Sequence, residues 1–136
     1  MAFAFPIRIY WEDTDAGGIV FYANYLKFFE RARTEWLRSL GIGQQALRGE
    51  TGGMFVVTDA QLRYLRPARL DDELIVTAQL EQAGRASFTI AQQAFIKTAD
   101  AAPGALLCQG SIRIGWVDAA TMAPTRIPRS LLEKIT

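Results

Sequence analysis

The stretch Asn24–Gly41, NYLKFFERARTEWLRSLG, decides the fold. Its apolar side chains recur every three or four residues, which places them in one stripe along a helix. The stripe comprises Tyr25, Phe28, Phe29, Ala32, Trp36 and Leu40. Asn24 is predicted to be the N-cap of this helix and Gly41 its left-handed C-terminal stop. A stripe of bulky aromatic residues needs a broad cover, and one face of a sheet is the natural partner.

The segments on both sides of this helix are predicted to be strands. Before it, Ile7–Asp13 alternates, with Ile7, Ile9 and Trp11 on one face. A glycine-rich loop over Gly41–Gly53 follows the helix. Four more strand patterns cover Met54–Leu65, Glu73–Gln82, Ser87–Thr98 and Ala105–Val117, and Ser130–Ile135 is predicted to form one or two helical turns. The order predicts an α+β architecture: one domain over residues 1–136, with one long helix against an antiparallel sheet of about five strands.

The composition excludes several kinds of chemistry. The 136 residues include no histidine and one cysteine, Cys108, and the formal net charge is +1. No Ser-His-Asp triad, Cys-His pair, histidine-ligated zinc or internal disulfide is therefore possible within this chain. We expect no metal and no cofactor, so acid–base or covalent chemistry near neutral pH falls to a carboxylate. The near-zero charge disfavours a nucleic-acid partner, and the lack of a targeting segment or membrane span predicts a cytoplasmic protein.

The segment Glu12–Tyr25, EDTDAGGIVFYANY, is the strongest candidate for a site. It places two aspartates and two glycines before the long helix, whose free N–H groups and positive dipole end favour an oxyanion or a phosphate. A carboxylate beside such donors can attack a carbonyl carbon, or activate water to attack it. If the strand extends that far, Asp13 and Asp15 share a face, and burial together would raise the pKa of one of them. The other interpretation is a turn of hydrogen-bonded or solvated carboxylates, because Asp and Gly are common there.

Two other motifs share part of this pattern and are rejected. D-x-D-x-x-G over Asp13–Gly18 is how an EF-hand loop begins, but Gly17 replaces the third ligand and Asn24 replaces the bidentate glutamate. A strand that ends in D-x-D is also typical of haloacid-dehalogenase-type phosphatases. Those enzymes need a parallel sheet with alternating helices, whereas here one helix precedes four strands in a row.

The run from Asp13 to Leu37, DTDAGGIVFYANYLKFFERARTEWL, closely resembles the hotdog-fold acyl-CoA thioesterases of the 4-hydroxybenzoyl-CoA thioesterase type. It is most similar to the bacterial Tol–Pal-associated acyl-CoA thioesterases. The resemblance covers nearly the whole chain, including YLRPARLDDEL from Tyr64 to Leu74. It implies a long helix wrapped by a curved antiparallel sheet, and a site built between the subunits of a homodimer or homotetramer.

The resemblance also implies roles for individual residues. Asp15 is the catalytic carboxylate, the backbone N–H of Tyr22 polarises the thioester oxygen, and Gly18 shapes the approach to the site. Hotdog dehydratases depend on a catalytic histidine, so a chain without histidine is not an enzyme of that kind. Many relatives have histidine near the helix start, where this chain has Phe21, Tyr22 and Ala23, which leaves the acyl-chain preference open.

Further residues are candidates for substrate binding. Arg85 and Ser87, in GRASF, fall where the hydroxybenzoyl-type relatives have a basic turn that contacts CoA phosphates, and arginine suits phosphate recognition. Arg126 is another candidate for this contact. Thr58 and Asp59 lie on the strand that in relatives lines the pocket of the neighbouring subunit. The alternative for each is an ordinary surface or strand residue.

The expected reaction is hydrolysis of the thioester of an acyl-CoA, or of an acyl group on an acyl carrier protein. Asp15 either attacks directly or activates water. Aspartate is ordinarily a weak base at neutral pH, which favours direct attack. The rival hypothesis is a non-catalytic hotdog module that binds acyl carrier protein or envelope-biogenesis partners.

Overall fold

The apolar stripe forms the buried face of helix α1, Asn24–Ser39, in the computed structural model, which describes residues 2–136. The buried side chains of the stripe are Tyr25, Phe28, Phe29, Ala32 and Trp36. The helix stops as predicted, because Gly41 has φ +82°, a left-handed conformation that glycine adopts without steric cost. The predicted central helix is confirmed.

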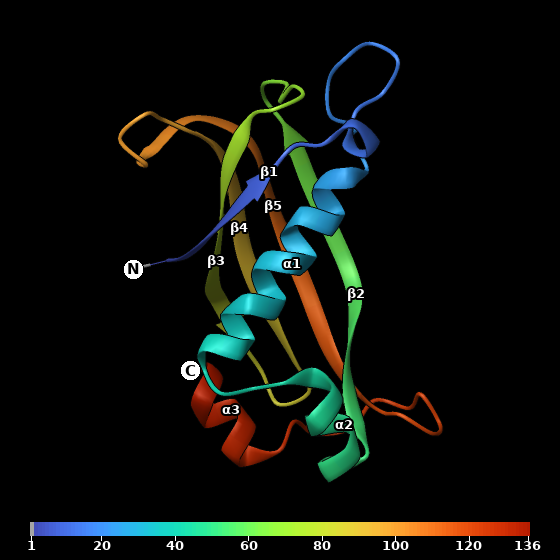
Figure 1. The fold of residues 1–136 in the computed structure, drawn as a ribbon. Coiled ribbons are helices and arrows are strands. Elements are labelled where there is room, and N and C mark those ends of the chain that lie inside the picture. The colour runs from blue at the N-terminus through green and yellow to red at the C-terminus, as the bar shows by residue number, and fades with distance from the viewer. Residues whose placement is uncertain (1) are drawn as a thin grey trace.

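The sheet has five antiparallel strands in the order β1-β3-β4-β5-β2. The strands are β1 (Phe3–Arg8), β2 (Gly53–Tyr64), β3 (Glu73–Ala83), β4 (Ser87–Lys97) and β5 (Pro103–Asp118). Figure 1 shows α1 running along one face of this curved sheet, antiparallel to β2. Strand β2 is an edge of the sheet, and within residues 2–136 it pairs with β5 alone. The predicted α+β class is confirmed.

The core lies between α1 and the face of the sheet that α1 covers. Alternate residues of the central strands are buried there, as the strand patterns predict. They include Leu74, Val76 and Ala78 on β3 and Phe88, Ile90 and Ala94 on β4. The Phe55 ring on β2 meets Phe88 and Trp116 edge-on, at centroid distances of 5.3 and 4.8 Å. These aromatic contacts join the edge strand to the centre of the core.

Gly53, the first residue of β2, lets that strand pack directly against the indole of Trp116. A Cβ at Gly53 would lie 2.2 Å from Trp116 Cζ2, and the indole is only 3% exposed. We expect Gly53→Ala to lower the free energy of unfolding by about 1–3 kcal/mol, because the core must shift to admit the methyl group. Thermal melting measures the loss. Gly49→Ala is the control, since its Cβ meets no heavy atom within 4 Å, and an equal loss there would contradict the packing argument.

Two predictions about the first strand and the loop after α1 are wrong. Strand β1 ends at Arg8, where its pairing with β3 ends, and residues Trp11–Asp13 form a 3-10 turn instead of continuing the strand. Trp11 is therefore 81% exposed and is not a core residue. Helix α2, Gln44–Thr51, occupies most of the segment predicted as a loop. Most glycines of that segment lie before or after α2. The high glycine content therefore indicates a loop although the residues between these glycines form a helix.

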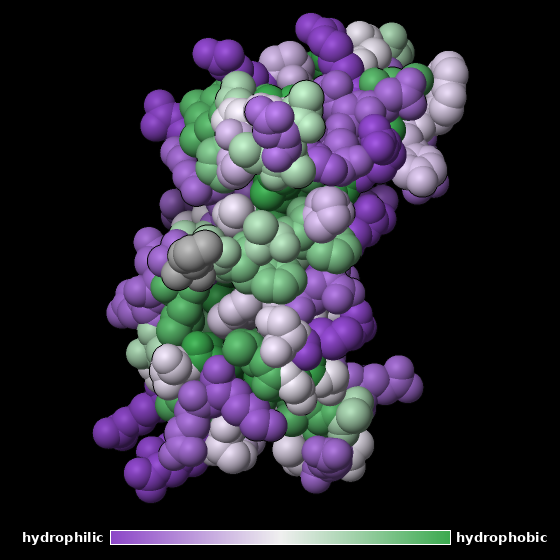
Figure 2. Space-filling view, turned by 60° about the vertical axis from the view of Figure 1, so that its left-hand side comes forward, coloured by the Kyte–Doolittle hydropathy of each residue, from purple (hydrophilic) through white to green (hydrophobic). Residues whose placement is uncertain are grey.

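The C-terminal prediction is confirmed. Helix α3, Arg129–Ile135, forms after the proline-rich exit and buries Leu131 and Ile135. Figure 1 shows α2 and α3 at the end of the molecule opposite the start of α1. Figure 2 views the side that carries the N-terminus, where a belt of hydrophobic surface crosses the middle between more hydrophilic ends.

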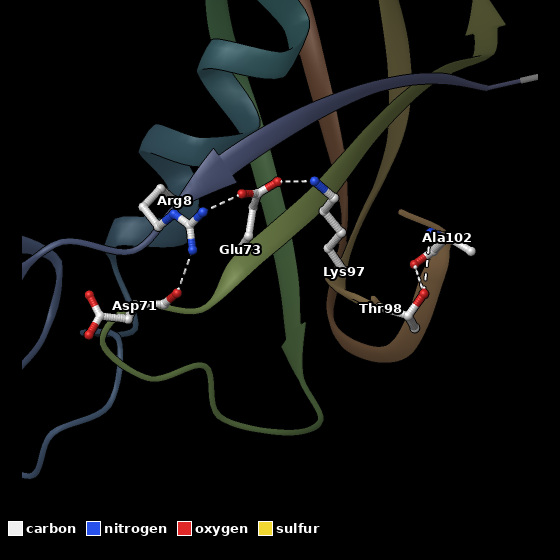
Figure 3. Close-up of polar contacts among 6 residues, drawn as sticks. All are labelled: Arg8, Asp71, Glu73, Lys97, Thr98 and Ala102. Atoms are coloured by element: carbon white, nitrogen blue, oxygen red, sulfur yellow. Dashed lines mark hydrogen bonds and ion pairs between the residues drawn. The ribbon is translucent and has the colours of Figure 1, made fainter. Parts of the chain in front are cut away.

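A charged cluster joins three strands at the start of β3 (Figure 3). Arg8 on β1 lies 2.6 Å from one carboxylate oxygen of Glu73 and also donates a 2.8 Å hydrogen bond to the carbonyl of Asp71. Lys97 on β4 pairs with the other Glu73 oxygen. Beyond Lys97, Thr98 and Ala102 exchange hydrogen bonds that close the loop into β5. The pKa of Glu73 is lowered, first by the hydrogen bond from Lys97 and then by the charges of Lys97 and Arg8, while partial desolvation opposes them.

This lowered pKa predicts a pH-dependent contribution to stability. A carboxyl group whose pKa is lower in the folded state stabilises the fold above its unfolded pKa, and the contribution disappears as the pH falls through the folded pKa. We therefore expect Glu73→Gln to melt below the wild type at neutral pH and the two melting temperatures to converge in acid. Melting curves between neutral and acidic pH measure this. A difference that persisted unchanged in acid would show that charge is not the cause.

Candidate active site

Asp15 lies in a short hairpin that precedes α1 and projects beyond it in Figure 1. Its backbone N–H donates to the carbonyl of Ile19 at 2.8 Å, and Thr14 pairs with Val20. The N–H of Gly18 donates to the carbonyl of Asp15 at 3.0 Å. Gly18 has φ +82°, the left-handed conformation that closes this three-residue loop. Gly18 therefore sets the turn that carries Asp15.

The two aspartates of the motif lie in different environments. The Asp15 side chain is exposed, and its Oδ1 accepts a 2.8 Å hydrogen bond from the N–H of Gly17. Asp13 is buried, with 6% exposure, and its Oδ2 accepts the N–H of Tyr10 at 2.8 Å. The condition for shared burial, a strand that extends to Asp15, is not met, because β1 ends at Arg8. The interpretation of Asp13 as a hydrogen-bonded turn carboxylate is confirmed, whereas the Asp15 side chain faces solvent.

The backbone N–H of Tyr22 points away from the protein's own acceptors at the start of α1. The carbonyl of Phe21, which belongs to the same peptide unit as this N–H, accepts the N–H of Asn24 at 2.8 Å. The carbonyl of Tyr22 accepts the hydroxyl of Tyr64 at 2.9 Å. Within residues 2–136 no acceptor pairs with the Tyr22 N–H itself. A fixed, unpaired donor at the positive end of a helix is suited to hold an oxyanion.

Asn24 has a different role from the predicted N-cap. The helix begins at Asn24 itself, and the preceding residue, Ala23, makes no side-chain cap. The Asn24 side chain instead donates through Nδ2 to the carbonyl of Asp13 at 2.9 Å. The N-cap prediction is wrong because this side chain reaches back into the hairpin, toward a carbonyl eleven residues earlier.

An apolar groove lies beside the Tyr22 peptide. It has a volume of about 310 Å³ and is lined by Ile19, Val20, Tyr22, Tyr25, Tyr64, Leu65, Arg66 and Pro67. The rings of Tyr22 and Tyr64 meet edge-on, and so do those of Tyr25 and Tyr64. A wall of aromatic and aliphatic side chains next to a polar donor suits a ligand with an apolar body and one polar reacting group.

Two buried groups, the Tyr25 hydroxyl at the groove and the Cys108 thiol, are unsuited to act as nucleophiles. Burial raises the pKa of Tyr25 to about 12 and that of the Cys108 thiol also to about 12. Both therefore remain protonated near neutral pH, and a thiol is a poor nucleophile compared with its thiolate. Asp15, in contrast, carries an exposed carboxylate in the hairpin that precedes α1.

The candidate phosphate-binding residues lie at the other end of the molecule. Arg85 occupies the turn between β3 and β4, and its carbonyl accepts the N–H of Ile127, the residue after Arg126, at 2.8 Å. Both arginines are exposed. In Figure 1 this turn is at the lower end, opposite the Asp15 hairpin. One chain thus brings Arg85 and Arg126 together but does not bring them to Asp15.

Arg113 links the remaining candidates. Thr58 forms an irregularity in the pairing of β2 with β5, and its hydroxyl lies 3.4 Å from the carbonyl of Arg113. Asp59 is in register with Arg113, whose guanidinium lies 3.4 Å from the hydroxyl of Ser87. The sequence pattern did not predict the contacts that Arg113, Asn24 and Tyr64 make with candidate site residues. Each of these side chains contacts a residue that is not a neighbour in the sequence.

Residues 2–136 contain no cluster of three or more His, Cys, Asp or Glu side chains that could bind a metal ion. Among the helices of the same residues, none is both long enough and apolar enough to span a membrane.

Known proteins with similar sequences and structures include several thioesterases. The acyl-CoA thioesterase YbgC of Haemophilus influenzae is 39% identical over 129 residues, which cover 95% of this chain and 90% of that protein. A probable thioesterase from Bartonella henselae is 28% identical, with a TM-score of 0.84 over 94% of this chain and 100% of that one. A 4-hydroxybenzoyl-CoA thioesterase variant crystallised with 4-hydroxybenzoyl-CoA is 18% identical, with a TM-score of 0.89 over 99% of both chains, and shows the shared fold.

These similarities agree with the architecture of the molecule. The long helix along a curved antiparallel sheet is the hotdog fold of these thioesterases, so the predicted fold is confirmed. The sequence model of the thioesterase-like superfamily matches residues 9–135, which include the hairpin, α1 and all strands after it. The chain therefore belongs to the thioesterase-like superfamily.

Proposed function

We propose that this protein hydrolyses the thioester of an acyl-CoA, with Asp15 as the reacting carboxylate and the Tyr22 N–H as the oxyanion donor. The observation that carries the proposal is the Tyr22 N–H, fixed at the positive end of α1 beside an apolar groove and without an acceptor in residues 2–136. The names of curated relatives, acyl-CoA thioesterase and acyl-CoA thioester hydrolase, support it.

The proposed reaction has two steps. The thioester oxygen accepts a hydrogen bond from the Tyr22 N–H while a carboxylate oxygen of Asp15 attacks the carbonyl carbon. The C–S bond breaks, the CoA thiolate leaves and takes a proton from solvent, and the acyl group remains as an anhydride with Asp15. Water then cleaves the anhydride to the carboxylic acid and restores Asp15. If Asp15 instead removes a proton from water, the water oxygen attacks the same carbon and the products are identical.

A second copy of the chain completes this site in our proposal. Within residues 2–136 the outer edge of β2 has no partner strand. Two apolar side chains, Leu26 on α1 and Val57 on β2, are 44% and 52% exposed, and both features suit an interface. Two β2 edges that pair antiparallel would bring the lower end of one chain toward the upper end of the other. Arg85 and Arg126 could then reach the phosphates of a CoA held at the partner's Asp15 hairpin.

We expect gel filtration to give a dimer or tetramer of the 15.1 kDa chain. Pairing of the β2 edges hides their free N–H and carbonyl groups as well as the apolar side chains. Val57→Lys should shift the protein toward monomer and lower its activity, because the charge would be buried in the interface. Asp100→Lys, at an exposed position in the loop between β4 and β5, is the control that introduces the same charged side chain away from β2. A monomeric wild type with full activity would overturn the two-subunit site.

Assays with a panel of substrates test the proposed reaction. Purified protein should release free thiol from at least one class of short-chain, long-chain or aromatic acyl-CoA, and the same assay applies to acyl groups on acyl carrier protein. The groove of about 310 Å³ is apolar but does not distinguish these classes. Binding of CoA or of acyl carrier protein without turnover of any substrate would instead support the non-catalytic module.

A further inference from the structure

We propose that Asn24 is a positioning residue that couples the Asp15 hairpin to the oxyanion donor at the start of α1. This inference rests on the proposed roles of Asp15 and Tyr22. The Asn24 side chain is 8% exposed, and its Nδ2 donates to the carbonyl of Asp13 at 2.9 Å. Its backbone N–H donates to the carbonyl of Phe21 at 2.8 Å. One residue therefore contacts both the hairpin and the peptide that carries the Tyr22 N–H.

The backbone contact sets the direction of the donor. Because the peptide unit is planar and trans, its carbonyl and N–H point in opposite directions. The Phe21 carbonyl turns toward Asn24 in the first turn of the helix, so the Tyr22 N–H turns away from the helix body. Removal of the Asn24 side chain leaves this backbone contact in place, and the two contacts can therefore be tested separately.

The side-chain contact holds the hairpin against the helix. The carbonyl of Asp13 lies two residues before Asp15 and already accepts the N–H of Phe21 at 2.9 Å. The Asn24 amide donates to the second lone pair of the Asp13 carbonyl oxygen. Because the Phe21 N–H already pairs with this oxygen, the carbonyl does not need the Asn24 amide for a hydrogen bond. Asparagine is also a poor residue for the helix itself, where alanine would serve better. What the amide adds is a fixed distance between the stem of the Asp15 hairpin and the first turn of α1.

This geometry predicts that removal of the Asn24 amide lowers kcat and leaves KM nearly unchanged. The apolar groove that receives the acyl group does not include Asn24, so substrate binding should persist without the amide. The hairpin would then move relative to the Tyr22 N–H, and small misplacements of reacting groups are costly in rate. We expect Asn24→Ala to lower kcat by about 10–100-fold with KM nearly unchanged. Asn24→Gln, which keeps the amide donor on a longer stem, should recover part of the loss.

A matched control separates positioning from stability. Gln92 is also buried, with 1% exposure, and its Nε2 donates to the carbonyl of Phe29 on α1 at 3.0 Å. Gln92→Leu removes this amide contact together with the contacts to Arg33 and Thr77, and it should lower the melting temperature while kcat is kept. If Asn24→Ala does not fold, Asn24→Asp replaces it, because it keeps the shape and loses the donor.

The kinetics of these variants and of Asp15→Asn are measured together. A lower kcat in Asn24→Ala, partial recovery in Asn24→Gln and a retained kcat in Gln92→Leu support the proposal. An unchanged kcat in Asn24→Ala, or an equal loss of kcat in Gln92→Leu, overturns it. When Asp15→Asn is inactive and Asn24→Ala is fully active, only this inference fails. When Asp15→Asn keeps the wild-type kcat, the proposed role of Asp15 fails, and the inference that rests on this role fails with it.

Discussion

Asp15→Asn is expected to lower kcat for acyl-CoA hydrolysis by at least about 100-fold, because a neutral amide neither attacks the thioester nor accepts a proton from water. The melting temperature should stay at the wild-type value. Asp15 is exposed, and the one hydrogen bond of its side chain, from the N–H of Gly17, can be accepted equally by the amide oxygen of asparagine. The variant therefore tests chemistry without disturbing the hairpin.

A matched carboxylate elsewhere completes this experiment. Asp100 is also exposed, in the loop between β4 and β5, and Asp100→Asn should keep full activity. Acid quench during turnover, followed by mass spectrometry of the peptide that contains Asp15, would detect an acyl group on Asp15 if that residue attacks directly. Full activity of Asp15→Asn would remove Asp15 from the reaction altogether.

The fold was predictable because its signals are periodic and local. The apolar stripe from Tyr25 to Trp36 specifies one face of a helix, and the alternation on β3 and β4 specifies one face of a sheet. Such patterns depend only on neighbours in the sequence. The same rule explains the failure at Trp11, which keeps the alternating pattern although the pairing with β3 has already ended at Arg8.

The candidate site was predictable only in part. Two aspartates and two glycines just before a helix are a local signal, and within this segment the family resemblance singles out Asp15, Gly18 and Tyr22. The contacts that fix their geometry are not local. Tyr64 reaches the Tyr22 carbonyl across 42 residues of sequence, and Asn24 satisfies the pattern of an N-cap while its side chain binds the hairpin. No periodicity encodes such pairs, so they appear only once the chain is folded.

Tyr22→Pro is expected to lower kcat by about 100–1000-fold, because proline lacks the backbone N–H that holds the oxyanion. Proline disrupts a helix in its interior, whereas Tyr22 lies two residues before the first residue of α1. Since the wild-type N–H has no acceptor in residues 2–136, its removal breaks no hydrogen bond of the folded chain there. The melting temperature should therefore fall much less than the rate.

Tyr22→Ala is the comparison that isolates the N–H. It keeps the backbone donor and loses the ring, which lines the groove and meets Tyr64 edge-on. The alanine variant should mainly raise KM, whereas the proline variant should mainly lower kcat, and both keep the carbonyl that accepts the Tyr64 hydroxyl. Equal kcat values in the two variants would show that the ring, and not the N–H, matters at this position. The oxyanion would then need another donor, and the helix start would lose its proposed place in the reaction.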